Sequence, residues 1–566
     1  MIIDLPVTVT VTVINSKFCA ALFEQSTKEC NSLSRQQACK MRDGNLLKRL
    51  STRLLQSSKT TNSPTRLKSS AVEDWTAVED EYLSARPYTE VPGPAPLPLL
   101  GNSWRFIPLI GDYRIENIDQ VCWRLHRRYG NIVKLAGLLG RPDMVFVFDA
   151  DEIERVFRSE ELMPHRPSMP SLNYYKHVLR KDFFGKDAGV IAVHGEQWYR
   201  FRSKVQQPML QPRTAKLYIQ PIEETAEAFI ERVRLIRNSD QEVPNDFLNE
   251  IHKWSLESIA RVALDARLGC LDDSSSLQAE TQALIDAINT FFHNVGVLEL
   301  KIPFWRVFNT PTWRKYIGAL DTITNITMKH ITAAMERLQH QGNVECTAQS
   351  SLLERVLALQ PDNPRLACIL ALDMILVGVD TTSAAVASIL YMLSLHPDKQ
   401  QRLYAEVSEA LPPGTNLTAE RLEQMPYLRA VIKETLRMYP VVIGNGRCMT
   451  RDSVVAGYQI PKGTQIVFQH YVISNSERYF SEPAKFLPER WLRPNRVQCH
   501  PFASLPFGYG RRMCLGRRFA DLELQTIVAK MIQAFQIEYH HKKLGYSIHP
   551  MYMPDGPLRF KMVDRI

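Results

Sequence analysis

The 566-residue sequence lacks a regular cysteine framework, because its ten cysteines lie far apart with no repeated spacing. Small secreted domains stabilised by disulfides need such a framework, so this class is excluded. The pattern suits a reducing compartment, in which most thiols are inert core residues. With 45% hydrophobic and 23% charged residues, the chain can bury a large core, and collagen-like and disordered classes are excluded as well.

The body of the chain lacks a charge surplus. The formal net charge is +9, but residues 1–70 contain eleven Lys or Arg against four acids, which leaves a net charge of only +2 on the rest. A general nucleic-acid footprint requires a broad positive surface. The charge distribution therefore disfavours nucleic acid as a partner, although it is compatible with a local basic patch on the surface.

The N-terminal segment lacks a membrane span, because polar residues and a proline interrupt the apolar residues of 1–23, and a span requires about 20 apolar residues. Residues 31–70 instead contain nine basic residues and one acid, and leucines recur at helical spacing from Leu46 to Leu55. Such a segment is typical of a mitochondrial presequence. We therefore predict a targeting presequence over residues 1–70, with Met41 as an alternative start; a solvated tail is the competing interpretation.

Residues 86–566 lack a Gly/Ser-rich linker and an evident repeat, so we expect one large domain there. Residues 71–85 are expected to be a linker, and the proline-rich residues 86–104 are expected to be extended. Helical periodicity dominates the remainder, which predicts a mainly α fold with minor β structure. The expected helices span residues 119–129, 151–159, 196–207, 218–236, 245–265, 278–293, 313–339, 364–395, 398–410, 421–438 and 515–534. The expected strands are two within 132–148, then 441–443, 453–459 and 465–469, with strands and turns over 536–562.

The segment around Cys514 carries the clearest chemical signal. Gly508 and Gly510 precede the cysteine and allow a close approach of the backbone to a flat ligand. A helical run begins three residues after the cysteine, and the N-terminus of a helix stabilises a thiolate. A lone cysteine is more often a small buried hydrophobe, and a zinc site would need more ligands than the nearby Cys499-His500 pair offers.

Five residues of this segment match the FxxGxRxCxG haem-binding signature of the cytochromes P450: Phe507, Gly510, Arg512, Cys514 and Gly516. The sequence therefore resembles this family, over about residues 86–566. The resemblance implies the family's mainly α, single-domain fold and haem b (iron protoporphyrin IX) as cofactor. It makes Cys514 the axial ligand of the haem iron, and Phe507 and Arg512 haem-binding residues. An anionic sulfur ligand pushes electron density onto the iron and favours cleavage of the O–O bond.

A second match is the ExxR pattern formed by Glu434 and Arg437, which are i, i+3 neighbours on a predicted helix. Alone, such a pair is usually solvated and contributes well under ~1 kcal/mol. In the family, an arginine from a PERF-type segment joins the pair, and here that residue is Arg490. The resemblance implies a structural triad that holds the core behind the haem.

A third match is a polar segment within the long apolar helix expected over 364–395. Buried Asp380 and Thr381 are costly there unless they serve a function, although a threonine hydroxyl can bond back to a carbonyl one turn earlier. The segment is similar to the family's AGx(D/E)TT motif, in which Asp380 and Thr381 would relay protons through water during oxygen activation. Val377 stands where the family often has a smaller residue, which is expected to narrow the pocket.

Four side chains resemble haem-propionate partners. Trp198 and Arg202 fit the family's WxxxR helix, Arg512 is a second candidate and Arg447 a third. Singly, each arginine would be a surface residue. Together they supply the positive charges that the two carboxylates of a buried haem need.

The mitochondrial branch of the family is favoured by the presequence and by the CxGRRxA pattern that starts at Cys514; the overall pattern is most like arthropod members. The branch implies an adrenodoxin-like [2Fe–2S] ferredoxin and its NADPH-dependent reductase as partners. The ferredoxin would dock near Arg429, Lys433, Arg517 and Arg518, since basic residues steer an acidic partner; a solvated helix face is the alternative. The resemblance also implies peripheral contact with the matrix side of the inner mitochondrial membrane.

The resulting hypothesis is a haem-thiolate monooxygenase that inserts one oxygen atom of O2 into a lipophilic small molecule, steroid-like or xenobiotic. Its pocket is expected from the loop 161–195, residues 283–300, the helix around Leu376–Thr381 and Val441–Ile443. One alternative is a haem-thiolate isomerase or a peroxide-driven enzyme, which would not need the proton relay. Another is a non-catalytic haem sensor or carrier.

Overall fold

The computed structural model describes residues 75–166, 168–340, 350–493, 499–548 and 551–565. The predicted presequence and Met41 lie outside these residues. The helices are α3 (Trp75–Ser84), α4 (Ile118–Tyr129), α5 (Ala150–Arg158), α6 (Pro170–Tyr174), α7 (Lys181–Phe184), α8 (Gly195–Leu210), α9 (Pro212–Lys216), α10 (Ile219–Ile236), α11 (Phe247–Leu264), α12 (Gln278–Leu300), α13 (Pro311–His340), α14 (Leu352–Leu359), α15 (Pro364–Leu395), α16 (Pro397–Ala410), α17 (Ala419–Glu423), α18 (Pro426–Met438), α19 (His470–Ser474) and α20 (Arg517–Ala534).

The strands are short and form four small sheets. They are β1 (Ile132–Leu135), β2 (Met144–Val147), β3 (Asn445–Cys448), β4 (Ser453–Val455), β5 (Tyr458–Ile460), β6 (Gln465–Phe468), β7 (Phe535–Glu538), β8 (Gly545–Ile548), β9 (Tyr552–Asp555) and β10 (Lys561–Asp564). The largest sheet has the order β1-β2-β6-β3, with β2 and β6 parallel and the other two pairs antiparallel. The remaining sheets are the pairs β4-β5, β7-β10 and β8-β9. The predicted mainly α fold with minor β structure is confirmed.

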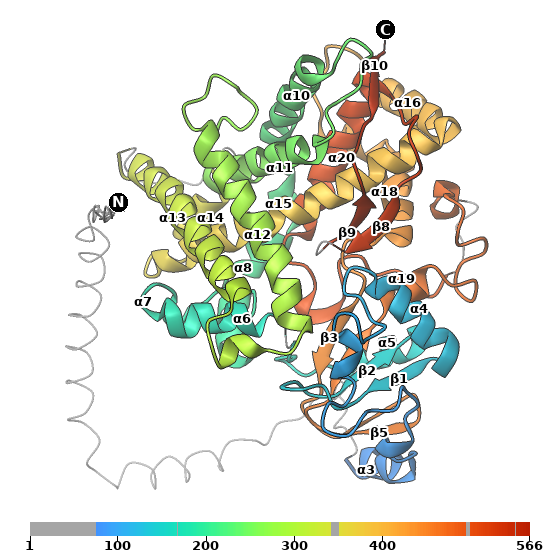
Figure 1. The fold of residues 1–566 in the computed structure, drawn as a ribbon. Coiled ribbons are helices and arrows are strands. Elements are labelled where there is room, and N and C mark those ends of the chain that lie inside the picture. The colour runs from blue at the N-terminus through green and yellow to red at the C-terminus, as the bar shows by residue number, and fades with distance from the viewer. Residues whose placement is uncertain (1–74, 167, 341–349, 494–498, 549–550, 566) are drawn as a thin grey trace, which may run out of the picture. The chain divides into compact units, whose positions relative to one another are not determined.

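Helix α15 forms the centre of the helical part of the fold. Helices α11, α13, α14, α18 and α20 pack against it. Figure 1 shows α11, α12 and α20 beside it, apart from the β1–β3 region. Among the described helices, α15 is the one that is long and apolar enough to cross a membrane, but 72% of its most apolar window is buried inside the protein. Packing in the core therefore accounts for its composition.

The structure corrects several predicted elements. Residues 421–438 do not form one helix: α17 ends at Glu423, and α18 begins at Pro426, because proline cannot donate the hydrogen bond that would continue α17. Residues 441–443 are not a strand, and the strand β3 begins at Asn445. The segment predicted as a linker contains α3, and two 3-10 turns interrupt the proline-rich entry segment.

Candidate active site

The loop before α20 holds Cys514 in a defined position. Gly508 and Gly510 have positive φ angles of 69° and 74°, which favour glycine. A side chain at Gly510 would also meet a carboxylate oxygen of Glu160 at 2.8 Å. The backbone N–H of Cys514 donates to the carbonyl of Phe507 at 2.9 Å, which closes the loop. Phe507 itself is partly buried against the main core.

The Cys514 thiol combines two properties that do not occur together in the buried Cys122 and Cys270. Its side chain is exposed, yet burial raises the pKa of the thiol. The N–H of Gly516 and the guanidinium groups of Arg202 and Arg166 act in the opposite direction and favour the thiolate. Both properties are explained if protein surrounds the sulfur atom on most sides and one side faces an accessible space. A sulfur atom that binds a metal from one side needs this arrangement.

Four arginines cluster near this sulfur and carry more positive charge than the protein neutralises: Arg166, Arg202, Arg447 and Arg512. Burial lowers the pKa of Arg512 to about 8, and repulsion by the other three guanidinium groups acts in the same direction. Burial also lowers the pKa values of Arg166 and Arg202 to about 10. In the described part of the chain, Arg166 Nε, Arg202 Nε and Arg512 Nη2 have no hydrogen-bond partner. Unpaired buried donors of this kind are costly unless an anion binds them.

Backbone carbonyls and one aromatic ring hold these arginines in place. Arg202 Nη2 donates to the carbonyl of Met513 at 3.0 Å. Arg512 donates to the carbonyls of Pro164 and Val193 at 3.0 and 2.9 Å, and its guanidinium stacks 3.7 Å from the ring centre of Trp198. The structure thus brings together the predicted Trp198, Arg202 and Arg512, and it places Trp198 as the platform under Arg512.

Sequence reasoning missed three members of this cluster. Arg447 was predicted, but Glu160, whose Oε1 lies 2.5 Å from Arg447 Nε, was not. Arg166 was not singled out, and neither was His194, whose pKa burial lowers to about 3, with His165 and Arg512 acting in the same direction. The only available signal was their position in or beside the loop 161–195, which was predicted to line the pocket.

These residues fit a ligand with two carboxylates and a metal. The four guanidinium groups, three of which belong to buried residues, have one paired carboxylate near them. This carboxylate is Glu160, whose Oε2 lacks a partner among the described residues. Two further carboxylates would nearly balance the remaining charge. In the described ranges, no group of three or more His, Cys, Asp or Glu side chains could hold a bare metal ion.

On α15, Asp380 and Thr381 face different partners. Thr381 Oγ1 donates to the carbonyl of Val377 at 2.8 Å, as a threonine bonded to its own helix does. Asp380 Oδ1 lies 3.2 Å from His252 Nε2 on α11, and both side chains are buried. The contact of Asp380 with His252 on α11 could not be predicted from the local sequence motif around Asp380. At Gly378, an added Cβ would meet Ile259 Cδ1 at 2.4 Å, so α11 approaches α15 closely here.

The predicted ion-pair triad is confirmed by its contacts. Arg437 donates to both carboxylate oxygens of Glu434 at 2.9 Å, and Arg490 Nε donates to Glu434 Oε1 at 3.0 Å. The indole of Trp491 and the backbone N–H of Leu487 also donate to Glu434. The spare donors of both arginines bind backbone carbonyls. Every member is buried, and the carboxylate is fully coordinated.

The predicted docking residues lie on α18 and α20, which pack together. The guanidinium groups of Arg517 and Arg518 and the ammonium of Lys433 all act to lower the pKa of Asp521, although burial, the largest cause, raises it. These three cations therefore surround one acid close to the start of α20. Arg429 is half-buried instead, and its guanidinium donates to the carbonyls of Leu422 and Glu423.

An apolar cavity of about 410 Å³ opens between residues 103–108 and 297–312. Its lining includes Phe106, Leu298 and Trp305. Residues 297–300 belong to the region 283–300 that was predicted to contribute to the pocket. Beside this mouth lie very exposed apolar side chains on two separate segments: Leu99, Leu109 and Ile110 on one, and Phe304, Val307 and Phe308 on the other.

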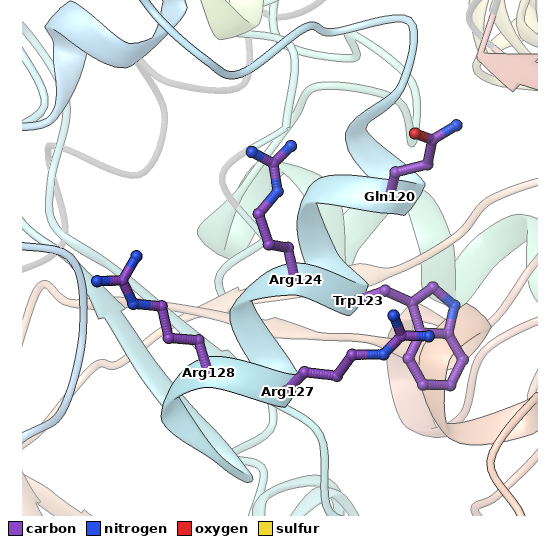
Figure 2. Close-up of a pocket in the computed structure, with 5 residues that line it drawn as sticks. All are labelled: Gln120, Trp123, Arg124, Arg127 and Arg128. Carbon is purple, nitrogen blue, oxygen red and sulfur yellow. The ribbon is translucent and has the colours of Figure 1, made fainter.

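The face of α4 near this mouth is basic. Figure 2 shows Arg124, Arg127 and Arg128 extending from successive turns, with Arg127 beside Trp123. The guanidinium of Arg127 lies 5.4 Å from the centre of that ring. Asp112 forms an ion pair with Arg124 at 3.3 Å. This pair connects the basic face of α4 to the segment that carries the exposed Leu109 and Ile110.

Comparison with known proteins places these features in a family. A family model described as "Cytochrome P450" matches residues 91–562. "Probable cytochrome P450 301a1, mitochondrial" and "Probable cytochrome P450 49a1", both of Drosophila melanogaster, are 51% and 50% identical to this chain; each alignment covers 85% of it, and 88% and 84% of the relative. "Probable cytochrome P450 12a5, mitochondrial" from the same organism is 37% identical over 86% of this chain and 92% of the relative.

Proposed function

The chain belongs to the cytochrome P450 family and is therefore a haem b-dependent monooxygenase, and we propose that it works in mitochondria with a [2Fe–2S] ferredoxin and oxidises a lipophilic small molecule. One observation carries the assignment of the site. The accessible Cys514 thiol lies beside four arginines, three of them buried, whose charge one carboxylate leaves largely unbalanced.

In this proposal, the Cys514 sulfur would bind the haem iron, and Arg166, Arg202 and Arg512 would offer their unpaired N–H groups to the haem propionates. Arg447 contributes charge while it remains paired with Glu160. Phe507 supports the loop, since its carbonyl accepts the Cys514 N–H. When bound, the haem supplies the activation of dioxygen, and the thiolate ligand assists this chemistry.

The chain's own contribution to proton delivery comes from α15. The Thr381 hydroxyl is held near the Val377 carbonyl and can exchange a proton with water on the accessible side of the helix. Asp380 is the next acid on the same helix turn, and it faces the interior beside His252. The two residues therefore span α15 from its buried side to its accessible side, as a proton relay requires.

Ferredoxin docking is assigned to the basic surface formed by Lys433, Arg517 and Arg518, with Arg429 at its edge. This surface lies at the start of α20, directly after Cys514, so an acidic protein bound there would approach the thiolate side of the haem. The names of two relatives include "mitochondrial". Together with the basic, acid-poor residues 31–70, they support a mitochondrial location.

Contact with the inner membrane is assigned to the mouth of the apolar cavity. Leu99 and Leu109 are 96% and 95% exposed, and Val307 across the mouth is 84% exposed. Exposed apolar tips beside a basic helix suit the interface of a bilayer with anionic lipids. A lipophilic substrate could pass from the bilayer into the cavity, which agrees with its apolar lining.

The test begins with the purified, haem-loaded enzyme and its Cys514→Ser variant. The reduced, carbon-monoxide-treated parent should show the red-shifted Soret band of thiolate-ligated haem, and the variant should lose it. Turnover of a steroid and xenobiotic panel is then compared with NADPH, reductase and ferredoxin, or with hydrogen peroxide alone. Peroxide-only activity would favour the peroxide-driven alternative, and haem binding without either activity would favour a sensor.

The membrane assignment is tested separately by flotation with anionic vesicles. Leu109→Ser should weaken binding, whereas Leu235→Ser, at a position on α10 that is 79% exposed, serves as the matched control. Equal binding by both variants would contradict the assigned face.

A further inference from the structure

We propose that His252 and Glu523 are positioning residues that fix the rotation of α15 about its axis and thereby the direction of the Thr381 side chain. The inference rests on the proposed role of Thr381 in proton delivery. It assigns to two residues outside the motif the task of presenting Thr381 to the accessible side of α15.

The accessible side of α15 is a narrow stripe. Met374, Val377, Gly378 and Thr381 are only partly buried, whereas the residues between them are buried. Successive residues of an α-helix are rotated by about 100°. Asp380 and Thr382 therefore flank this stripe on opposite sides, one on each side of Thr381. We call these two flanks of the helix its shoulders: Asp380 is on the first and Thr382 on the second.

His252 holds the first shoulder. Its Nε2 lies 3.2 Å from Asp380 Oδ1, with side-chain exposures of 5% and 7%. This is a close polar contact, and in the ranges that the structure describes neither His252 Nε2 nor Asp380 Oδ2 has a hydrogen-bond partner. His252 therefore supplies the polar contact of this buried carboxylate, and a leucine at this position would remove it.

Glu523 holds the second shoulder. It lies on α20, and its Oε2 accepts a hydrogen bond from the Thr382 hydroxyl at 3.5 Å. Its Oε1 accepts a shorter one, at 2.8 Å, from Ser258 of α11. Glu523 thus joins α11, α15 and α20 at one buried point, and α20 is the helix that follows Cys514.

Contacts on both shoulders resist rotation of α15 in either direction. If α15 turned, either Asp380 would leave His252 or Thr382 would leave Glu523, and a buried polar group would lose its partner. The Thr381 hydroxyl, bonded to Val377, moves with the helix. Loss of one positioning residue should therefore misdirect Thr381 without removing it.

The experiment uses the haem-loaded enzyme and four variants. His252→Leu and Glu523→Leu remove the two contacts. His252→Gln keeps an N–H donor near the position of Nε2, and Ser255→Ala is the matched control, because Ser255 is a buried α11 residue whose hydroxyl has no partner within the described residues. Should a leucine variant fail to fold, His252→Asn and Glu523→Gln replace it.

The first readout is independent of activity. Urea unfolding of His252→Leu, Asp380→Asn and the double variant should reveal a coupling of about tenfold in the unfolding constant. Additive effects would show that the two side chains do not interact and would overturn the proposal.

The second readout is the product formed per NADPH consumed. This ratio should fall at least about threefold in both leucine variants, stay near the parent value in His252→Gln, and be unchanged in Ser255→Ala. A parent-like ratio in His252→Leu would overturn the proposal. If Thr381→Ala itself leaves the ratio unchanged, the proposed function of Thr381 fails, while the unfolding cycle still decides whether the contact exists.

Discussion

Two buried arginine clusters of this protein differ in how their charge is satisfied. In the triad, Glu434 accepts hydrogen bonds from two arginines, an indole and a backbone N–H. The other N–H groups of the two arginines donate to backbone carbonyls. In the cluster near Cys514, three arginines keep unpaired donors within the described residues. Buried ions that are fully coordinated stabilise a fold, whereas buried ions with spare donors indicate a missing anionic ligand.

The comparison predicts its largest effect at Glu434. Glu434→Ala leaves Arg437 and Arg490 buried without their carboxylate, and we expect a loss of about 3–5 kcal/mol in the free energy of unfolding. Urea unfolding, or the yield of soluble protein if the variant does not fold, measures this loss. A change below about 1 kcal/mol would mean that the triad is not the structural element inferred here.

The opposite result is expected at Arg512. Arg512→Met removes a guanidinium group whose pKa burial already lowers to about 8, so the haem-free protein should lose little stability or gain some. Haem affinity should fall on the order of tenfold to a hundredfold, because one propionate loses a charged donor. Transfer of haem to an acceptor protein measures the affinity. If Arg512→Met instead destabilised the haem-free protein as strongly as Glu434→Ala does, the contrast between the clusters would be lost.

Glu523 provides an intermediate case, since its buried carboxylate accepts hydrogen bonds from two hydroxyl groups and pairs with no cation among the residues that the structure describes. Burial raises its pKa to about 7 from 4.5, so between these values the folded state binds more protons than the unfolded state. The free energy of unfolding contributed by this group is therefore fully present below pH 4.5 and falls as pH rises through 7, by an amount on the order of 1–3 kcal/mol. Glu523→Gln should flatten the pH dependence of urea unfolding over this range. An unchanged pH profile would show that Glu523 keeps an ordinary pKa.

The smallest effect is expected at the exposed cations of α18 and α20. Lys433→Gln and Arg518→Gln should each weaken ferredoxin binding by a factor of about 2–10, with a reduced dependence on salt, and should leave stability unchanged. Titration of ferredoxin at two ionic strengths measures both quantities. Arg200→Gln, at an exposed position on α8, is the control, and an equal effect there would argue against a defined docking surface.

Much of the site was predictable because its signals are contiguous in sequence. The Cys514 loop, the pair of Glu434 and Arg437 and the polar segment of α15 each occupy fewer than a dozen consecutive residues. Long helices such as α15 were also predictable from their periodicity. The division of residues 421–438 at Pro426 was missed, although proline signals such a break, because hydrophobic spacing continues across it.

The sequence by itself determined the candidates for the chemistry, since residue types at fixed local spacing single out Cys514, Asp380 and Thr381 and the arginine on the same loop as Cys514. Only the tertiary structure decided the partners. Arg166 and Glu160 reach the site from a distant loop, and His252 and Glu523 reach α15 from α11 and α20. The physical reason is that burial and charge balance depend on which distant segments meet, and local spacing does not encode those contacts.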